Sequence, residues 1–352
     1  MSSKKRTITV GNIKIGGVYP VAIQSMTNTK TCDIERTVSQ IKKLKASGCE
    51  IVRVAVPDKD SAIAVKSLVS STEIPLVADI HYDYKLAIKS IESGVHKVRI
   101  NPGNIGAEWK VKEVVKAARE HHVPIRVGAN SGSLKSDFKH YSPEKALAES
   151  ALSEVRLLEK MSFEEIVISV KSSDVGETVK ANEYIDTKVD YPLHVGVTES
   201  GIGVDGTVKS TLGIGILLSK GIGNTIRVSL PGDPLKEVIV AKSILKALGM
   251  KKGVTIIACP TCGRTEIDVE RLAERIEKAT RNIDESIRIA VMGCVVNGIG
   301  EGSNSDIGIA GTKEGAAIFI DGEIIETVKR EKIEEEFMKY LNKIIKNRRD
   351  NA

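Results

Sequence analysis

The sequence has few aromatic residues and no long apolar run. Phe, Trp and Tyr together make up 3% of its 352 residues, and no dense Lys/Arg stripe is present. Both features argue against binding of nucleic acid, which uses aromatic stacking and basic patches. No stretch approaches the roughly eighteen consecutive apolar residues of a membrane-spanning helix. We therefore expect a protein that binds neither nucleic acid nor membrane.

Cysteine is scarce, and an export signal is missing. The chain has five cysteines, an odd number, and its basic start, Met-Ser-Ser-Lys-Lys-Arg6, is not followed by an apolar stretch. These features predict a reducing, cytoplasmic location and exclude a disulfide-based scaffold. The net charge of +6, with 41% hydrophobic and 28% charged residues, is typical of a soluble globular protein. The length allows two domains.

The first two-thirds of the sequence alternates β-branched runs with amphipathic segments. Ile34, Val38, Ile41 and Leu44, for example, recur at helical spacing. Continuous apolar strands separated by helices indicate a parallel sheet that is covered by helices. Eight such units fit a (β/α)8 TIM-type barrel better than an open doubly wound sheet. The eight runs are Val21–Thr27, Ile51–Val56, Pro75–Ile80, Lys97–Pro102, Pro124–Asn130, Glu165–Val170, Pro192–Val197 and Thr225–Leu230.

A second domain is expected after Gly249. Before the barrel, Thr7–Tyr19 reads as a hairpin; after Gly249 the barrel pattern stops and a smaller α+β domain begins. We therefore predict residues 1–249 as the substrate-binding barrel and residues 250–352 as the α+β domain. The elements expected in the second domain are strands at Val254–Ala258, Ile287–Val291, Ile307–Ala310 and Ala316–Ile320, a charged helix at about 266–279 and an amphipathic terminal helix.

Basic residues interrupt the apolar strands of the predicted barrel. They are Arg53, Arg99, Arg126 and Arg227, with Lys171 directly after the sixth strand, against the carboxylates Asp79, Asp83 and Glu199. Buried charges require partners of opposite sign, so these cations either pair locally with acids or bind an anion. Their excess at the strand ends, where barrel enzymes have their active sites, favours a small substrate with more than one phosphate group.

Other polar residues at the strand ends give weaker signals. His81 and His194 are candidate site residues, although a lone histidine is more often structural. Asn130 and Ser229 can bind hydroxyl or phosphate groups, but both residue types are also common where loops begin. The glycine-rich run from Glu199 to Gly206 follows strand seven, where barrels often bind phosphate through backbone N–H groups.

Three cysteines of the second domain form a metal-binding pattern that lacks one ligand. Cys259 and Cys262 form a C-x-x-C pair after one predicted strand, and Cys294 follows the next. Thiolates select zinc or an iron–sulfur cluster, and both usually require four protein ligands. An incomplete set leaves one position at which a substrate can bind.

The fourth ligand has one candidate in the sequence. Cys32 and Cys49 lie in the barrel and are expected to be buried as small apolar residues, and no histidine follows His194. Glu301 lies seven residues after Cys294 in a glycine-rich segment. A glutamate in such a turn is ordinarily only solvated; here the missing ligand makes it a candidate that would exchange readily.

Several motifs together resemble a known family. The chain closely resembles the 4-hydroxy-3-methylbut-2-enyl diphosphate synthases, in their short bacterial form, over essentially its whole length. One departure is Ile299, where many members have proline. The motifs are Cys-Pro-Thr-Cys-Gly-Arg-Thr-Glu266, Met-Gly-Cys-Val-Val-Asn-Gly298, Gly-Glu301, Ala-Asp-Ile-His81, Val-Arg-Ile-Asn-Pro-Gly103, Ile-Arg-Val-Gly-Ala-Asn130 and Ile-Arg-Val-Ser229.

This resemblance implies a cofactor, a reaction and partners. It implies a [4Fe–4S] cluster on Cys259, Cys262, Cys294 and Glu301. The implied reaction is the reductive ring opening and dehydration of 2-C-methyl-D-erythritol 2,4-cyclodiphosphate in the methylerythritol phosphate route to isoprenoids, with two electrons from flavodoxin or ferredoxin. It also implies a head-to-tail homodimer with shared active sites, which the short link after Gly249 favours independently.

The resemblance also assigns roles to individual residues. His81, Asn130, Glu199 and Asn297 match residues near the reacting carbons, with Glu199 as the expected proton donor, and Glu301 completes the catalytic set as the exchangeable ligand. The substrate-binding residues that it implies are Arg53, Arg99, Arg126, Asn130, Lys171, Arg227 and Ser229.

Two alternatives remain open on the residues alone. One is a non-redox barrel enzyme that binds phosphate and carries a structural zinc domain; the missing Cys or His ligand counts against it. The other is a metal-dependent binding module whose barrel has lost its catalytic activity. The five strand-end cations count against it.

Overall fold

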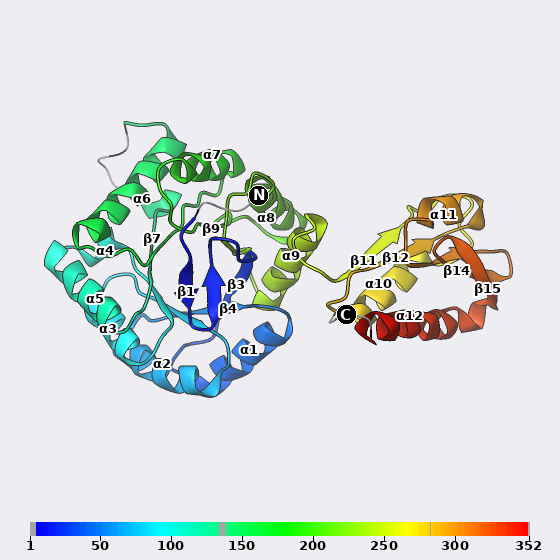
Figure 1. The fold of residues 1–352 in the computed structure, drawn as a ribbon, viewed down its shortest axis with the longest axis horizontal. Helices are drawn as coiled ribbons and strands as arrows, with labels where there is room; N and C mark the ends of the chain where they lie inside the picture. The colour runs from blue at the N-terminus through cyan, green and yellow to red at the C-terminus, as the bar shows by residue number, and fades with distance from the viewer. Residues whose placement is uncertain (1–4, 134–137, 139, 282, 351–352) are drawn as a thin grey trace. The chain divides into compact units, whose positions relative to one another are not determined.

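The chain forms two compact units in a computed structural model, Met1–Met250 and Lys251–Ala352. The structure describes residues 5–133, 138, 140–281 and 283–350, and of these it gives only the backbone for residues 133, 297–299 and 301. Among these residues, no helix is both long and apolar enough to span a bilayer. Figure 1 shows the ribbon.

The first unit is a closed parallel barrel. The order of its strands is β8-β7-β6-β5-β4-β3-β10-β9, with parallel pairing throughout. A bridge between Ile168 and Leu193 joins the two end strands and completes the ring. The predicted TIM-type fold is confirmed. The strands are β3 (Ala22–Met26), β4 (Ile51–Ala55), β5 (Leu76–Asp79), β6 (Lys97–Arg99), β7 (Ile125–Val127), β8 (Ile166–Ile168), β9 (His194–Val195) and β10 (Thr225–Ile226).

Helices surround this barrel as a ring (Figure 1). An aspartate begins several of them: the side chains of Asp33, Asp58, Asp83, Asp174 and Asp233 each accept a hydrogen bond from a backbone N–H of the first turn. The helices are α1 (Ile34–Ala46), α2 (Lys59–Ser71), α3 (Tyr84–Glu92), α4 (Pro102–Ile105), α5 (Glu108–Glu120), α6 (Pro143–Lys160), α7 (Val175–Asp186), α8 (Gly203–Ser219) and α9 (Pro234–Ala247).

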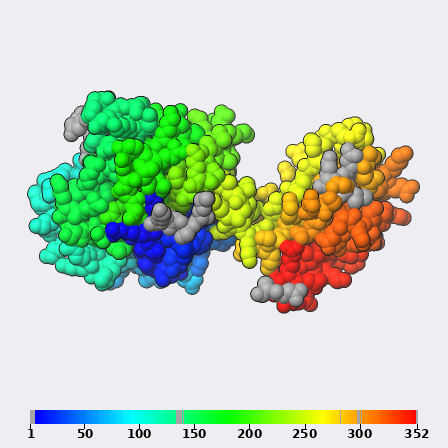
Figure 2. All heavy atoms as spheres, turned by 45° about the horizontal axis from the view of Figure 1, so that its top comes forward, coloured from blue at the N-terminus to red at the C-terminus, as the bar shows by residue number. Residues whose placement is uncertain are grey.

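A hairpin closes the amino-terminal end of the barrel. Its strands β1 (Ile8–Val10) and β2 (Ile13–Ile15) pair antiparallel, as the sequence predicts. Ile8, Val10 and Ile15 are buried against apolar residues at the start of the barrel strands. The hairpin is seen at the centre of the ring in Figure 1 and, in blue, at the surface of the barrel unit in Figure 2. The opposite, carboxyl end of the strands therefore remains as the face for a site.

The second unit is a five-stranded sheet with helices on both faces. Strands β11, β12 and β13 are parallel, whereas β14 and β15 continue the sheet antiparallel. The apolar sides of α10 and α12 share one core with the sheet, and α11 packs near a second, smaller core. The elements are β11 (Val254–Ala258), α10 (Val269–Thr280), β12 (Ile287–Met292), α11 (Val295–Gly302), β13 (Ile307–Gly311), β14 (Gly315–Ile320), β15 (Glu323–Lys329) and α12 (Ile333–Asp350).

Candidate functional site

Asp79 is the central acid at the carboxyl ends of the barrel strands. It ends β5, is only 5% exposed, and accepts a hydrogen bond from Arg99 Nη1 at 3.1 Å. Arg53 Nε lies 3.8 Å from the other carboxylate oxygen, and His81 Nε2 lies 3.5 Å from that same oxygen. His81 Nε2 also lies 3.1 Å from Arg99 Nη1. Three residues predicted for the site therefore converge on one carboxylate.

The surrounding charges determine the protonation state of Asp79. Burial by itself would raise the pKa of Asp79. The charge of Arg53, the hydrogen bond with His81, and the charges of Arg99 and Arg126 together hold that pKa well below its ordinary value. Burial lowers the pKa of Arg53 to about 10, against the opposing attraction of Asp79. The carboxylate is therefore ionised at neutral pH and is shared among several cations.

Arg126 and Lys97 are buried basic side chains with no carboxylate hydrogen-bond partner among the residues that the structure describes. Arg126, on β7, is 1% exposed, and its Nε and Nη1 have no hydrogen-bond partner among the described residues. Lys97, on β6, is fully buried, and its Nζ likewise has none there. Burial, reinforced by neighbouring guanidinium groups, lowers the pKa of both side chains well below their ordinary values. Such groups are expected where an anion binds.

Lys171 and His194 form a second buried pair. Lys171 Nζ lies 3.2 Å from His194 Nε2, and His194 Nδ1 lies 2.8 Å from Thr225 Oγ1. Burial is the main cause that lowers the pKa of both residues well below normal, and the charges of Lys171 and Arg126 add to the effect on His194. His194 is thus a neutral imidazole that contacts the lysine amine. Lys171 thus lies shortly after β8, and His194 contacts both this lysine and Thr225.

Arg227 has a local acid partner on α9. Its Nε and Nη2 lie 3.4 and 3.2 Å from the carboxylate oxygens of Glu237, a residue that is 4% exposed. Glu237 also accepts hydrogen bonds from Ser25 Oγ at 2.9 Å and from the backbone N–H of Leu230 at 3.2 Å. Ser229 precedes this N–H, so Glu237 fixes the backbone beside it.

The remaining predicted barrel residues lie at neighbouring strand ends. Asn130 and Lys171 form a backbone bridge between the segments that follow β7 and β8. Glu199 is exposed, and its backbone has the left-handed value φ +49°. The next residue, Ser200, donates a hydrogen bond from its hydroxyl group to the carbonyl of Ser229 at 2.7 Å. This contact brings the segments after β9 and β10 together.

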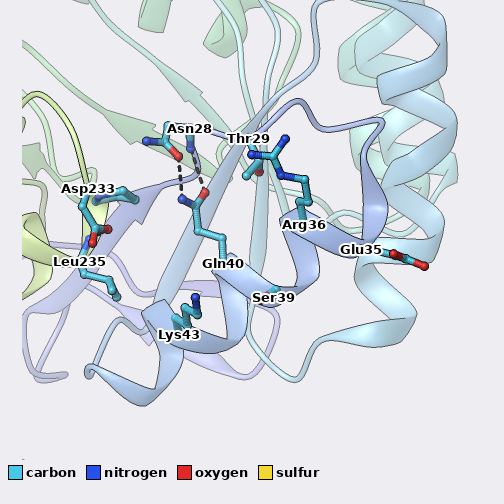
Figure 3. Close-up of a pocket in the computed structure, with 10 residues that line it drawn as sticks. Asn28, Thr29, Glu35, Arg36, Ser39, Gln40, Lys43, Asp233 and Leu235 are labelled. Atoms are coloured by element: carbon cyan, nitrogen blue, oxygen red, sulfur yellow. Dashed lines mark hydrogen bonds between the residues drawn. The ribbon is translucent and has the colours of Figure 1, made fainter.

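A cavity of about 640 Å³ lies at the rim of this face, between α1 and α9. Figure 3 shows Asn28 and Gln40, two of the residues that line it, pointing toward each other. Gln40 Oε1 accepts from the Asn28 N–H at 3.0 Å, and Gln40 Nε2 donates to Asn28 Oδ1 at 2.6 Å. Asn28 Nδ2 donates to the carbonyl of Gly232 at 3.0 Å. These bonds tie α1 and the segments after β3 and β10 together.

In the second unit, two of the cysteines follow adjacent parallel strands. Cys259 comes directly after β11 and Cys294 comes shortly after β12, and these strands pair side by side. The Cys259 N–H donates to the carbonyl of Val291 at 3.0 Å, and the Gly293 N–H donates to Cys259 Sγ at 3.0 Å. A backbone N–H directed at sulfur stabilises a thiolate and is typical of iron–sulfur ligation.

The loop that carries Cys262 packs against the same strand end. The N–H of Cys262 donates to Thr265 Oγ1 at 3.0 Å, and the N–H of Glu266 donates to the carbonyl of Gly293 at 2.8 Å. Cys262 is exposed and Cys294 half-buried. The chemistry and the backbone placement of these thiols suit a soft metal centre. In the described part of the chain, however, no three His, Cys, Asp or Glu side chains already converge as a metal-binding group.

Asn297 and Glu301 belong to α11, which begins directly after Cys294. The structure describes the backbone at these two positions; their side chains lie outside the described residues. Their expected roles therefore remain predictions.

Lys97 and Glu237 were not predicted from the sequence as residues of this face, and the prediction that Cys32 is buried was wrong. The alternation Lys97-Val98-Arg99 could have indicated the first, because residues two apart share a face of a strand. Glu237 lies in a helix and gives no such signal. Cys49 is buried as expected, but Cys32 is exposed, because it lies in the turn before α1.

The fold and the strand-end residues define the class of protein: a (β/α)8-barrel enzyme that carries a separate cysteine-containing α+β domain. Residues 5–242 match the GcpE TIM-barrel domain, and residues 255–343 match the GcpE protein C-terminal domain. The chain belongs to the GcpE family of 4-hydroxy-3-methylbut-2-en-1-yl diphosphate synthases, which are oxidoreductases. The family and the enzyme class expected from the motifs are thereby confirmed.

Similar curated proteins span almost the whole chain. One from Thermotoga maritima is 57% identical over 341 residues, covering 97% of this chain and 98% of its own length. One from Caldanaerobacter subterraneus is 54% identical over 351 residues, covering 98% and 99%. Both are named 4-hydroxy-3-methylbut-2-en-1-yl diphosphate synthase (flavodoxin).

Solved structures resemble the fold at low sequence identity. Dihydropteroate synthase from Xanthomonas albilineans aligns with a TM-score of 0.51 and 13% identity, over 69% of this chain and 98% of its own. N-acetylneuraminic acid synthetase from Leptospira borgpetersenii aligns with a TM-score of 0.50 and 15% identity, over 78% and 96%. At this identity the likeness concerns the fold alone.

Proposed function

We propose that this protein opens the ring of 2-C-methyl-D-erythritol 2,4-cyclodiphosphate and releases 4-hydroxy-3-methylbut-2-enyl diphosphate. The reaction consumes two electrons and two protons, cleaves the C–O bond that closes the ring to the phosphate, and releases one oxygen of the substrate as water. The site must therefore hold a polyanion, deliver protons at defined atoms and receive electrons.

The observation that carries this proposal is the excess of cations in the barrel. Cyclic and linear diphosphates bear several negative charges, and guanidinium groups suit phosphate oxygens. The carboxylates that act on these cations are Asp79 and Glu237, so a bound diphosphate would supply the missing negative charge. The basic side chains gathered there are Arg53, Lys97, Arg99, Arg126, Lys171 and Arg227.

We assign substrate binding to Arg53, Arg99, Arg126, Lys171 and Arg227, with Asn130 and Ser229 as neutral hydrogen-bonding groups. Asp79 and Glu237 hold three of the arginines in place before the substrate arrives. This preorganisation reduces the cost of ordering them during binding.

Proton transfer is assigned to residues at the rim of the same face. Glu199 is exposed in the segment that follows β9 and is the proposed donor of a proton to the substrate. His81 lies between Asp79 and Arg99 and is oriented by both. Asn297, in α11, is the fourth residue that we place near the reacting carbons.

We assign a [4Fe–4S] cluster to Cys259, Cys262, Cys294 and Glu301. The observations that favour it are the placement of two cysteines at adjacent strand ends and the N–H of Gly293 directed at Cys259 Sγ. When bound, the cluster would supply the two electrons one at a time. Glu301, as the one oxygen ligand among thiolates, would be the ligand that exchanges.

We further propose flavodoxin or ferredoxin as the electron donor and a reducing, cytoplasmic location. The curated relatives carry flavodoxin in their names. A reducing compartment would keep the cysteines available as thiolates.

We also propose a head-to-tail homodimer with shared sites. Six residues, 248–253, join α9 to β11; even fully extended they span only about 20 Å. Helix α9 runs back from the carboxyl face of the barrel over a similar distance. A link this short therefore favours an arrangement in which the second unit of another copy, and not that of the same chain, meets each barrel. An exposed apolar row on α8, formed by Val204, Val208, Leu212 and Ile216, offers a surface for that copy.

The test combines metal analysis with substrate binding. Anaerobically purified protein should contain iron and acid-labile sulfide and should turn over the cyclic diphosphate with reduced flavodoxin. Arg126→Ala should keep its iron and sulfide. It should bind the substrate about tenfold to a hundredfold more weakly, because a charge-assisted hydrogen bond contributes roughly 1.5–3 kcal/mol. A zinc protein without iron, or unchanged affinity in this variant, would contradict the proposal and favour the non-redox alternative.

A further inference from the structure

Lys97 is a buried lysine that has no role in the site as assigned above. Its side chain is fully buried in β6, and its Nζ has no hydrogen-bond partner among the described residues. A lysine with no partner in such a place lowers the stability of the fold. Its position therefore calls for a functional explanation.

The sheet places Lys97 inside the barrel, deeper than Arg99 and Arg126. Val98 and Ile100 belong to the core between sheet and helices, so Lys97 and Arg99 point to the other face, the barrel interior. In the register of the sheet, Lys97 and Arg53 both pair with Val77. Arg99 pairs in turn with Arg126. In this register Lys97 is thus level with Arg53 and lies two residues deeper along the strands than Arg99 and Arg126.

The surroundings of Lys97 are cationic above and apolar below. The apolar floor includes Ile51, Val77 and Val167. Among the described residues, the titratable and charged groups that the strands contribute to the interior and its mouth are Arg53 from β4, Asp79 from β5, Arg99 from β6 itself, Arg126 from β7, Lys171 after β8, His194 from β9 and Arg227 after β10. Asp79 is already shared by Arg53 and Arg99.

We propose that Lys97 is a further positioning residue, which is a neutral amine in the free protein and takes up a proton when the anionic substrate binds above it. The proton comes from solvent and ends on Nζ. The ammonium group so formed stabilises the bound phosphates from below, together with Arg53 and Arg126. This inference rests on the proposed function and deepens it.

Electrostatics supports this order of events. Burial, Arg126 and Arg53 lower the pKa of Lys97 well below its ordinary value in the free protein. A bound polyanion raises that pKa again, because an opposite charge nearby favours the charged form. Substrate affinity should therefore decrease as pH rises above the pKa that Lys97 has in the free protein.

The experiment is calorimetric titration of the cluster-loaded protein with the cyclic diphosphate, without a reductant so that no turnover occurs. Titrations in two buffers of different ionisation enthalpy give the number of protons taken up. Relative to the native protein, Lys97→Met should take up fewer protons, by as much as one, and bind about tenfold more weakly. It should also unfold at a higher temperature, because a buried unpartnered amine has been replaced by an apolar group.

Two further variants make the result decisive. Lys97→Gln cannot titrate, so it should lose the same proton uptake even if the methionine variant folds poorly. Lys66→Met removes an exposed lysine from α2 and should change neither quantity. Unchanged proton uptake or unchanged affinity in the Lys97 variants overturns this inference. If Arg126→Ala also binds normally, the proposed function fails with it; if Arg126→Ala binds weakly, only the role of Lys97 fails.

Discussion

Asp79 illustrates how one buried carboxylate can organise several cations. Arg53 on β4 and Arg99 on β6 lie on the two strands that flank β5, and without Asp79 on β5 their guanidinium groups would be buried with no acid between them. Breaking a buried ion pair by removing one partner costs more than the pair contributes, because the other charge remains uncompensated. Asp79 therefore acts on stability and on the geometry of the site together.

We predict that Asp79→Asn lowers the free energy of unfolding by about 3–5 kcal/mol at pH 7, as measured by chemical denaturation. The pKa of Asp79 is lower in the folded than in the unfolded protein, so its contribution is present above its ordinary pKa and is lost as pH falls. The difference between native protein and variant should therefore shrink below about pH 4.

The control for this prediction is Asp60→Asn, at an exposed position in the first turn of α2. It should change stability by about 0.5 kcal/mol or less. A similar effect of both substitutions, or a difference that grows as pH falls, would show that Asp79 has no special role.

The two barrel cysteines should differ sharply in reactivity. Burial raises the pKa of the Cys49 thiol to about 12, whereas Cys32 is exposed. Because the thiolate is the reactive form, iodoacetamide should label Cys32 in the folded protein and leave Cys49 unmodified. Peptide mass spectrometry gives the result, and unfolded protein, in which both residues react, is the control. Labelling of Cys49 at the rate of Cys32 would contradict its burial.

At the scale of elements, α11 is the segment on which the cluster proposal depends. It begins directly after Cys294 and contains the positions of Asn297 and Glu301, one turn apart. One short segment thus joins Cys294, directly before the helix, to the proposed exchangeable ligand within it. Its two ligands should respond differently to substitution.

We predict that Cys294→Ala loses most of its iron and sulfide, because only two thiolates remain. Glu301→Ala should keep a cluster, since three thiolates remain, but should lose most of its activity. Iron and sulfide analysis, electron paramagnetic resonance and turnover distinguish the two results. Val296→Ala, at an exposed position of the same helix, is the matched control and should behave as the native protein. Normal turnover of Glu301→Ala would remove this residue from the ligand set.

The elements were largely predictable from the sequence, and their contacts were not. Each of the eight apolar runs contains a barrel strand, because buried parallel strands need continuous apolar sequence. Strand β15 was missed because its sequence, Glu-Ile-Ile-Glu-Thr-Val-Lys, is largely exposed at the edge of its sheet and lacks a buried pattern. The strand-end arginines were visible as charges in apolar runs. Their sharing of Asp79 depends on strand register, which the sequence pattern does not fix.

For the whole molecule, the proposed sharing of sites between two copies has one specific consequence. Arg126 belongs to the barrel unit and Cys294 to the second unit. In a head-to-tail dimer each site combines the barrel of one copy with the second unit of the other. A defect in Arg126 and a defect in Cys294 can then be separated in a mixed dimer.

We therefore predict complementation between two inactive variants. Arg126→Ala and Cys294→Ala, mixed anaerobically under conditions that allow subunits to exchange, should form heterodimers with one site that has both an intact barrel and an intact second unit. Random exchange makes about half of the dimers mixed, so up to roughly a quarter of the native activity per site should return. Each variant incubated alone is the control. If each site is instead built within a single chain, every site in the mixture carries a defect, and no activity returns.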